Sequence, residues 1–220
     1  MKYWFYDVVK GLLWLFFRLG FGLEVLGQDR VPTTGAFLLA SNHVSYLDPP
    51  LIGVACPRRL SFMAQADLFK HLLLGAFLRG VHAIPLRRGE GDLGAMREAL
   101  ARLRRGEAVA IFPEGARQVS GRLGAAKRGA GLLAATARVP FVPVQVKGTY
   151  EALPPRARRV RRAKIRVAFG EAISYTKAAV SSLHASKTER GEGPPSPRDD
   201  YQRLADALSS QWRRLEEQWP

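Results

Sequence analysis

The chain has 220 residues, a formal net charge of +15 and a hydrophobic content of 47%. This length is typical of one domain with a substantial core, and nothing in the sequence suggests an internal repeat. The single cysteine, Cys56, excludes a disulfide within the chain, while the positive charge favours nucleic acid, anionic lipid or phosphorylated substrates as partners.

Residues 1–27 are predicted to form a membrane-associating helical segment. Its aromatic residues are mixed with Lys10, Arg18 and Glu24, a pattern typical of a helix that lies in the head-group layer of a membrane. The longest apolar run without a charge, residues 11–17, is far shorter than the roughly 20 residues needed to span a bilayer. Two alternatives stay open: a helix packed on the domain's own core, and a signal peptide, against which the internal charges argue.

Residues 28–180 are predicted to form the main domain, because short apolar runs alternate with helical patterns. The expected strands are residues 36–40, 59–64, 81–86, 108–112 and 141–146, with a late or edge strand over 165–169. The expected helices are a short one that starts near Pro50 and stops before Pro57, and residues 66–79, 92–105 and 125–137. This alternation favours βαβ units. The predicted fold class is therefore a single α/β domain with a largely parallel or mixed central sheet flanked by helices.

Three further segments lie towards the end of the chain. Residues 156–166 hold seven basic residues and are either a solvated loop or an anion-binding patch. Residues 181–198, rich in Ser, Gly, Pro and charge, are predicted to be a linker. Residues 199–220 carry apolar side chains at helical spacing and are predicted to be an amphipathic helix. That helix should pack on the core, with membrane contact as the alternative.

Four of the expected strands are each followed directly by polar or glycine-containing residues. These loops are residues 41–48, 87–89, 113–117 and 147–149. If these strands are parallel, the four loops lie along the carboxyl edge of one sheet, where open α/β sheets bind ligands. The first loop carries His43 and Asp48, which are five positions apart. On a helix these residues would point about 140° apart, so a loop between a strand and a helix suits them better.

His43 is a candidate general base, since an imidazole can accept a proton near neutral pH. Asp48 can accept a hydrogen bond from the other ring nitrogen and stabilise the imidazolium as it forms. Ser41 or Ser45 is a less favoured alternative as a nucleophile, because a serine so close in sequence to the histidine rarely has the right approach. No further His, Cys or paired carboxylate lies at ligand spacing, so a metal site is not expected.

Two arginines are candidates for binding a phosphate. Arg88 and Arg117 provide forked donors that match phosphate oxygens, with ordinary surface salt bridging as the alternative for either one. Glu114 lies between a proline and a glycine in a predicted tight turn. It would either bind a substrate hydroxyl or hold an arginine in place.

Four blocks of the sequence resemble the glycerolipid acyltransferase family, which includes the 1-acyl-glycerol-3-phosphate acyltransferases. Residues 42–48 are similar to its His-x4-Asp block, and residues 84–89 to its second block. Residues 112–117 resemble its Phe-Pro-Glu-Gly-Thr-Arg block, and residues 139–144 its fourth block. The four blocks occur in the family's order, and the resemblance covers residues 35–149.

The resemblance implies a mechanism and a set of site residues. His43 would deprotonate an acceptor hydroxyl, Asp48 would orient His43, and the hydroxyl would attack an acyl thioester. The residues implied in binding the phosphate and glycerol parts of the acceptor are Arg88, Glu114, Gly115 and Arg117. A Lys-x-Gly pattern that often follows the third block is matched by Lys127 and Gly129. The acyl or thioester channel would be lined by Val142 and Pro143.

The implied reaction is acyl transfer from acyl-CoA or acyl carrier protein to the sn-2 hydroxyl of lysophosphatidate, giving phosphatidate in phospholipid synthesis, with no cofactor or metal. The implied partners are the lysophospholipid acceptor, the acyl donor and an anionic membrane surface. The implied location is the cytoplasmic side of the cell membrane, where the protein would be peripheral or monotopic. Backbone amides near His43 are candidates for the oxyanion donor.

Two departures from the family pattern leave the acceptor open. Ala116 replaces the usual threonine, and Arg87 stands where an aspartate is common. The alternative acceptors are another lysolipid or glycerol-3-phosphate. An alternative of a different class is a non-catalytic basic protein that binds membranes or nucleic acid, but no nucleic-acid motif supports it.

Overall fold

The structure, a computed structural model, describes residues 3–87, 92–174 and 197–218. Its centre is a seven-stranded sheet with the strand order β1-β7-β6-β2-β5-β3-β4. The strands are β1 (Glu24–Leu26), β2 (Phe37–Ser41), β3 (Leu60–Gln65), β4 (Ile84–Leu86), β5 (Ala108–Ile111), β6 (Phe141–Lys147) and β7 (Arg166–Phe169).

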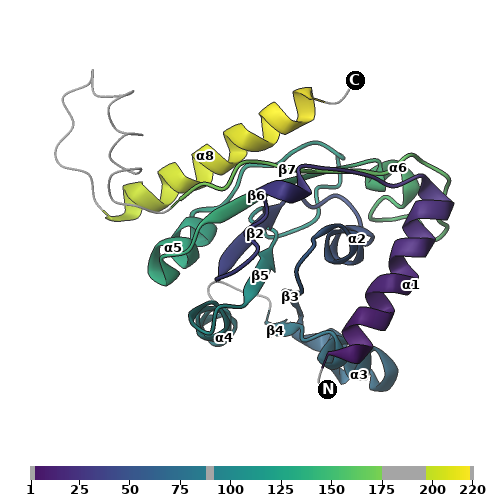
Figure 1. The fold of residues 1–220 in the computed structure, drawn as a ribbon, viewed down its shortest axis with the longest axis horizontal. Helices are drawn as coiled ribbons and strands as arrows, with labels where there is room; N and C mark the ends of the chain where they lie inside the picture. Colours follow the sequence, from purple (N-terminus) through teal and green to yellow (C-terminus); the bar gives the residue numbers. More distant parts are fainter. Residues whose placement is uncertain (1–2, 88–91, 175–196, 219–220) are drawn as a thin grey trace.

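Helices cover both faces of this sheet (Figure 1). The α-helices are α1 (Trp4–Phe21), α2 (Asp48–Ala55), α3 (Leu72–Gly80), α4 (Leu93–Arg104), α5 (Arg128–Ala137), α6 (Thr149–Ala152) and α8 (Pro197–Glu217). Two 3-10 helices cover Gln28–Arg30 and Ala66–Lys70. Helices α1 and α2 pack on one face of the sheet, whereas α4, α5 and α8 pack on the other. The predicted single α/β domain is confirmed.

The five strands from β2 to β6 run parallel to one another, which fixes where the loops after them lie. Strand β2 pairs with both β5 and β6, so that Leu38 lies beside Val109 on one side and Phe141 on the other. Strand β3 pairs in the same direction with β5 and β4. Only β7 and β1 run the other way, because β7 is antiparallel to β6 and β1 is parallel to β7. The sheet is therefore mixed, and the strands that precede the four predicted loops all end at one edge.

Helix α8 packs on the sheet, as the spacing of its apolar residues predicts. Leu208 and Trp212 are buried, and the Trp212 indole N–H donates a hydrogen bond to the Ala40 carbonyl at 3.2 Å. Ala40 lies in β2, so α8 supports the strand that leads into the predicted active loop. Of the expected linker, residues 181–198, only the last two are described, and they begin α8.

Helix α1 packs on the core with one side and exposes apolar side chains on the other. Phe17 and Phe21 are buried in the cluster that α1 and α2 form with the sheet. The large apolar side chains that α1 exposes are Trp4, Val8, Leu12, Trp14, Leu15, Phe16 and Leu19. Among the described residues, no helix has both the length and the apolar character needed to cross a membrane.

The sequence predicts one helix over residues 66–79, but the structure divides this segment at His71. The backbone of His71 is extended, with φ −74° and ψ 127°, so a 3-10 helix precedes it and α3 follows it. Helix α3 turns back until Gly75 touches the backbone of Phe69, an approach that a Cβ atom would prevent. The two side chains that this turn leaves most exposed, each at 83%, are Leu72 and Leu73.

Candidate active site

The loops that follow β2 and β5 meet at the carboxyl edge of the sheet. The His43 ring stacks on the Phe112 ring, with 4.0 Å between centroids and 22° between planes. The Gln118 N–H donates to the His43 carbonyl at 2.7 Å, and the His43 N–H donates to Glu114 Oε1 at 3.4 Å. Because β2 and β5 are neighbouring parallel strands, the first and third predicted loops come together.

His43 and Asp48 form a hydrogen-bonded pair. The distance from His43 Nδ1 to Asp48 Oδ2 is 2.8 Å, and Asp48 is fully buried. The same carboxylate oxygen accepts the backbone N–H groups of Val44 and Ser45, each at 2.7 Å. An oxygen with these three contacts acts as an acceptor, so the ring proton of His43 lies on Nδ1. The other ring nitrogen, Nε2, is therefore the one that can accept a proton from a substrate.

Two prolines help to start α2 at Asp48. Pro49 and Pro50 occupy the first turn, where the N–H groups of a helix have no intrahelical partner, so their missing donors cost nothing. The Asp48 side chain points back to the loop and accepts its backbone N–H groups. This tight turn brings residues five positions apart into hydrogen-bonding distance, which a continuous helix does not do.

The polar residues beside the histidine hold the loop in place. The Ser45 hydroxyl donates to the Leu153 carbonyl at 2.7 Å, and the Ser41 hydroxyl donates to the Asn42 carbonyl at 3.1 Å. The Asn42 amide donates to the Val146 carbonyl at 3.0 Å and accepts the Val146 N–H at 2.7 Å. These contacts favour supporting roles for both serines over nucleophilic ones. Asn42 also supports the loop, although the sequence reasoning did not single it out within the His-x4-Asp block.

Glu114 is buried beside His43 and joins the two loops. Only 4% of Glu114 is exposed, and this burial raises the pKa of its carboxyl to about 7. Hydrogen bonds from the His43 N–H, the Gln118 side chain and the Gly124 N–H lower the pKa, but by less than burial raises it. The sequence suggested a substrate hydroxyl or an arginine as the partner of Glu114. Its contact with the His43 N–H shows that it also positions the loop of the base, and the contact with a substrate hydroxyl stays a prediction.

We expect Glu114 to make the free energy of unfolding decrease as the pH rises from about 4.5 to about 7. A carboxyl group with a raised pKa in the folded state stabilises the fold fully below its unfolded pKa, and this contribution is lost as the pH rises through the folded pKa. The rise from 4.5 to about 7 corresponds to roughly 3 kcal/mol. Urea denaturation across this range should show a weaker pH dependence for Glu114→Gln than for the wild type. If the free energy of unfolding depended on pH equally in the wild type and in Glu114→Gln, Glu114 would not be the group with the raised pKa.

Arg117 and Lys127 bring positive charge to the loop that follows β5. The Arg117 guanidinium lies over the Tyr46 ring, with Cζ 3.5 Å from the ring centroid, and this cation–π contact orients the arginine. Lys127 lies over Gly115, because a Cβ atom on that glycine would be 2.9 Å from Lys127 Nζ. Gly115 has φ +76°, a left-handed conformation that glycine adopts most readily. Tyr46 is a site residue that sequence reasoning missed.

The structure does not bring every predicted residue to this site. Arg88 lies outside the described residues. Gly129 is exposed in the first turn of α5, where a Cβ atom would meet no other atom within 4 Å. Val142 is packed in the core cluster of α1 and α2, and Pro143 lies beside Gly170 on the opposite face of the sheet. The family resemblance implied that both residues line the acyl or thioester channel. The structure corrects this expectation, because the side chains of β6 point into the two helical layers.

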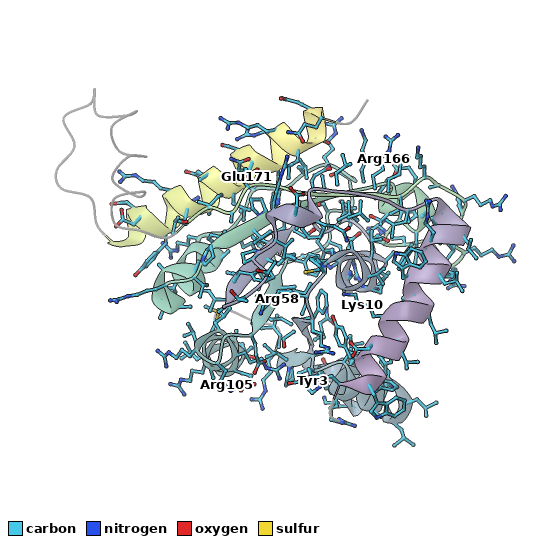
Figure 2. All side chains as sticks on the ribbon, viewed as in Figure 1. Tyr3, Lys10, Arg58, Arg105, Arg166 and Glu171 are labelled. Carbon is cyan, nitrogen blue, oxygen red and sulfur yellow. The ribbon has the colours of Figure 1, made fainter. Side chains whose placement is uncertain are left out.

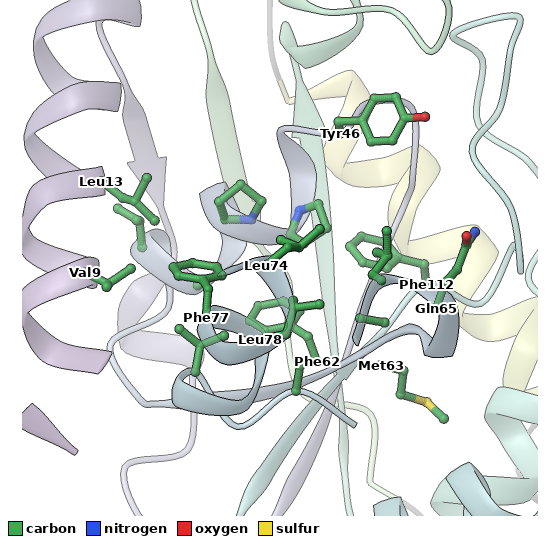
Figure 3. Close-up of a pocket in the computed structure, with 18 of the residues that line it drawn as sticks. Val9, Leu13, Tyr46, Phe62, Met63, Gln65, Leu74, Phe77, Leu78 and Phe112 are labelled. Atoms are coloured by element: carbon green, nitrogen blue, oxygen red, sulfur yellow. The ribbon is translucent and has the colours of Figure 1, made fainter. Parts of the chain in front are cut away.

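His43 lines an apolar cavity of about 480 Å³. Figure 3 shows this cavity in close-up. Helices α1, α2 and α3 and strand β3 form its walls. The apolar side chains that line it include Val9, Leu13, Phe62, Leu74, Phe77 and Leu78. The residues of the active edge that line the same cavity are His43, Tyr46, Phe112 and Arg117. An extended apolar group bound here would lie next to the His43–Asp48 pair.

The chain matches a known protein family. A family model described as "Acyltransferase" matches residues 22–147, which is more than half of the chain. The matched span contains His43, Asp48, Glu114 and Arg117, the residues that the fold gathers at the active edge.

The chain is also similar to curated proteins. It is 30% identical over 128 residues to the 1-acyl-sn-glycerol-3-phosphate acyltransferase of Bacillus subtilis, covering 58% of this chain and 63% of that protein. It is 36% identical over 99 residues to the lyso-ornithine lipid O-acyltransferase of Pseudomonas aeruginosa, covering 44% of this chain and 36% of that protein. The chain thus spans less than two thirds of the length of either relative.

A solved structure has the same fold. The 1-acyl-sn-glycerophosphate acyltransferase PlsC of Thermotoga maritima superposes with a TM-score of 0.74, covering 96% of this chain and 78% of that one. The two sequences are 22% identical in this comparison. At that level of identity the likeness shows a shared fold.

Proposed function

Because this chain belongs to the acyltransferase family, we propose that it transfers an acyl group from acyl-CoA or acyl carrier protein to the sn-2 hydroxyl of lysophosphatidate. The observation that carries this proposal is that His43, hydrogen-bonded to Asp48, lines an apolar cavity that Arg117 also lines. The cavity would bury the acyl chain, the pair would activate the hydroxyl, and the arginine would meet the phosphate. The product is phosphatidate, and the chemistry needs no cofactor or metal.

His43 is the general base in this reaction. Its Nε2 takes the proton of the acceptor hydroxyl while the hydroxyl oxygen attacks the thioester carbonyl. The buried Asp48 carboxylate stabilises the imidazolium that forms. The tetrahedral intermediate then collapses with loss of the thiolate, which takes the proton from the imidazolium. Because a thioester is already activated, positioning of the base and both substrates suffices without a covalent enzyme intermediate.

The backbone amides near the base were the expected oxyanion donors, but three of them have other partners. The N–H groups of Val44 and Ser45 donate to Asp48, and the N–H of His43 donates to Glu114. These amides orient the catalytic pair. The oxyanion of the intermediate therefore needs a donor other than these three amides.

A second candidate acceptor is a lysolipid with a different head group. Ala116 replaces the threonine that is usual in the third block, so a hydroxyl contact to the head group is missing. The relative from Pseudomonas aeruginosa, which is named for a lyso-ornithine lipid, favours this candidate. Both acceptors would use the same base and the same thioester chemistry.

Release of thiol from acyl-CoA tests the proposed function directly. We expect thiol release by the purified protein to depend on lysophosphatidate, and mass spectrometry to identify phosphatidate as the product. A parallel reaction with lyso-ornithine lipid separates the two acceptors. Thiol release that is the same with and without any acceptor would count against acyl transfer.

The two exposed apolar surfaces of α1 and α3 suit a peripheral or monotopic position on a membrane, which we propose to be the cytoplasmic side of the cell membrane. The α1 and α3 helices touch through Phe5 and Phe77, whose ring centroids are 6.2 Å apart (Figure 1). Both helices also line the apolar cavity. Adsorption through these surfaces would place the cavity at the level of the lipid tails, and the net positive charge favours anionic lipid.

Charges placed on α3 should weaken this adsorption. We expect Leu72→Glu with Leu73→Glu to lower the partition of the protein into vesicles of anionic lipid by at least about tenfold, because two exposed leucines lose their burial in lipid. Flotation of the protein with vesicles measures this partition. The matched control is Leu93→Glu with Val160→Glu, which adds the same charge at other exposed apolar positions. Equal partition of the two double variants would rule out a role for α3.

A further inference from the structure

A second cavity, of about 580 Å³, lies at the amino-terminal edge of the sheet. Its lining includes Leu60 and Ala108, the first residues of the neighbouring parallel strands β3 and β5. His43 instead follows the carboxyl end of β2, which runs parallel to β5. The second cavity and the proposed active site therefore lie at opposite edges of the sheet.

Positive charge dominates the walls of this second cavity. The cationic side chains that line it are Lys10, Arg58, Arg59, Arg102 and Arg105, and the acidic ones are Asp7 and Glu107. They leave an excess of three positive charges, which Glu98, an ion-pair partner of Arg102 just outside the lining, reduces to two. Figure 2 labels four of the lining residues. Lys10 lies in α1 and Tyr3 directly before it, while Arg58 and Arg105 lie in the connections that lead into β3 and β5.

Three of the arginines have carboxylate partners. Arg59 makes two hydrogen bonds to Asp7, at 2.9 and 2.6 Å. Arg102 pairs with Glu98, and Arg105 pairs with Glu107, each at 2.8 Å. The excess charge of the cavity must therefore come from the two other cations.

Arg58 and Lys10 are held by backbone carbonyls instead. The Arg58 guanidinium donates to the carbonyls of Pro32, Gly35 and Gly106 and lies 5.1 Å from the centroid of the Phe37 ring. The Lys10 ammonium donates to the Cys56 carbonyl at 2.5 Å. Neutral carbonyls fix the direction of both side chains without a carboxylate in direct contact. Asp7, which pairs with Arg59, also attracts the charge of Lys10, so Arg58 carries most of the excess positive charge that an anion would meet.

The aromatic part of the wall has an unusual backbone. His82 has φ +57°, a left-handed conformation that is uncommon for residues other than glycine. Its carbonyl accepts a hydrogen bond from Arg102, and its ring lies 5.0 Å from the Tyr3 ring, centroid to centroid. Such uncommon conformations persist where surrounding contacts impose them, and they cluster at ligand sites.

We propose that this second cavity binds a phosphate group, with Arg58 and Lys10 as its principal contacts. Its volume lies in the range of small-molecule sites. Three of the five N–H donors of the Arg58 guanidinium go to carbonyls, which leaves two for phosphate oxygens. The phosphate belongs either to a soluble phosphoester or to the head group of an anionic phospholipid. In both cases the phosphate would bind at the edge of the sheet opposite His43, although Lys10 lines both cavities.

Titration with inorganic pyrophosphate tests the proposal without using acyl transfer. We expect calorimetry near physiological salt to show at least about tenfold weaker binding for Arg58→Gln than for the wild type, because a charge-assisted contact contributes a factor of that order. The matched control is Arg213→Gln, which removes the same charge from an exposed position on α8. If Arg58→Gln does not fold, the same titration is made with Lys10→Gln, which should also bind pyrophosphate more weakly than the wild type. The proposal would be overturned if Arg58→Gln and Lys10→Gln bound pyrophosphate as tightly as Arg213→Gln does.

Vesicle binding identifies the source of the phosphate. Phosphatidylcholine vesicles with and without phosphatidate are floated with the wild type, Arg58→Gln and Arg213→Gln. A loss of phosphatidate-dependent flotation in Arg58→Gln alone assigns the site to a lipid head group. Unchanged flotation together with weaker pyrophosphate binding assigns it to a soluble phosphoester.

Discussion

Replacing His43 by alanine is expected to lower kcat for acyl transfer by about 10²–10⁴-fold, the usual contribution of a general base. Nε2 of His43 is the ring nitrogen that can accept the hydroxyl proton, because Nδ1 is engaged with Asp48 at 2.8 Å. Without the imidazole, the acceptor hydroxyl must lose its proton to water while the acyl chain still binds in the cavity. The loss should therefore appear in kcat much more than in KM.

Thiol release at saturating acyl-CoA and lysophosphatidate measures this effect. The matched control is His71→Ala, which removes an exposed histidine from the start of α3. Flotation with anionic vesicles shows whether His43→Ala still adsorbs as the wild type does. If His43→Ala kept a kcat near that of the wild type, the assigned base would be wrong.

The arrangement of the active edge could be predicted from the sequence because it depends on local patterns. The alternation of apolar runs and helical segments indicated parallel strands, and parallel strands place their following loops at one edge. That reasoning alone brought together His43, Asp48 and Glu114. It did not show that Glu114 holds the His43 backbone, since a partner in another loop leaves no mark in the local sequence.

Other features depend on contacts that the periodicity of the sequence does not reveal. Strand β1 has three residues and is fixed by pairing with β7, where Glu24 lies beside Arg166. The break at His71 follows from the packing of Gly75 on Phe69, so periodicity predicted one helix where there are two. Both cavities depend on how α1 docks on the rest of the domain, because Tyr6, like Lys10, lines both of them.

Replacing Asp48 by asparagine should separate the charge of this residue from its hydrogen bonds. We expect kcat to fall by about 10²–10⁴-fold, because a neutral amide no longer stabilises the imidazolium that forms on His43. The asparagine oxygen can take the position of Oδ2 and accept the N–H groups of Val44 and Ser45, so the loop should keep its shape. Asp48→Ala instead leaves these two buried N–H groups unpaired, at a cost of about 1–3 kcal/mol each.

Urea denaturation and kcat measured on the same two variants distinguish these effects. Asp48→Asn should lose most of its activity and less stability than Asp48→Ala, which should lose both. Near-normal activity in Asp48→Asn would mean that the carboxylate acts only by holding the loop. Both variants are needed because one oxygen of Asp48 contacts the base and also the backbone of the loop that carries the base. A loss of activity in Asp48→Ala by itself would therefore not show that the negative charge of Asp48 acts in catalysis.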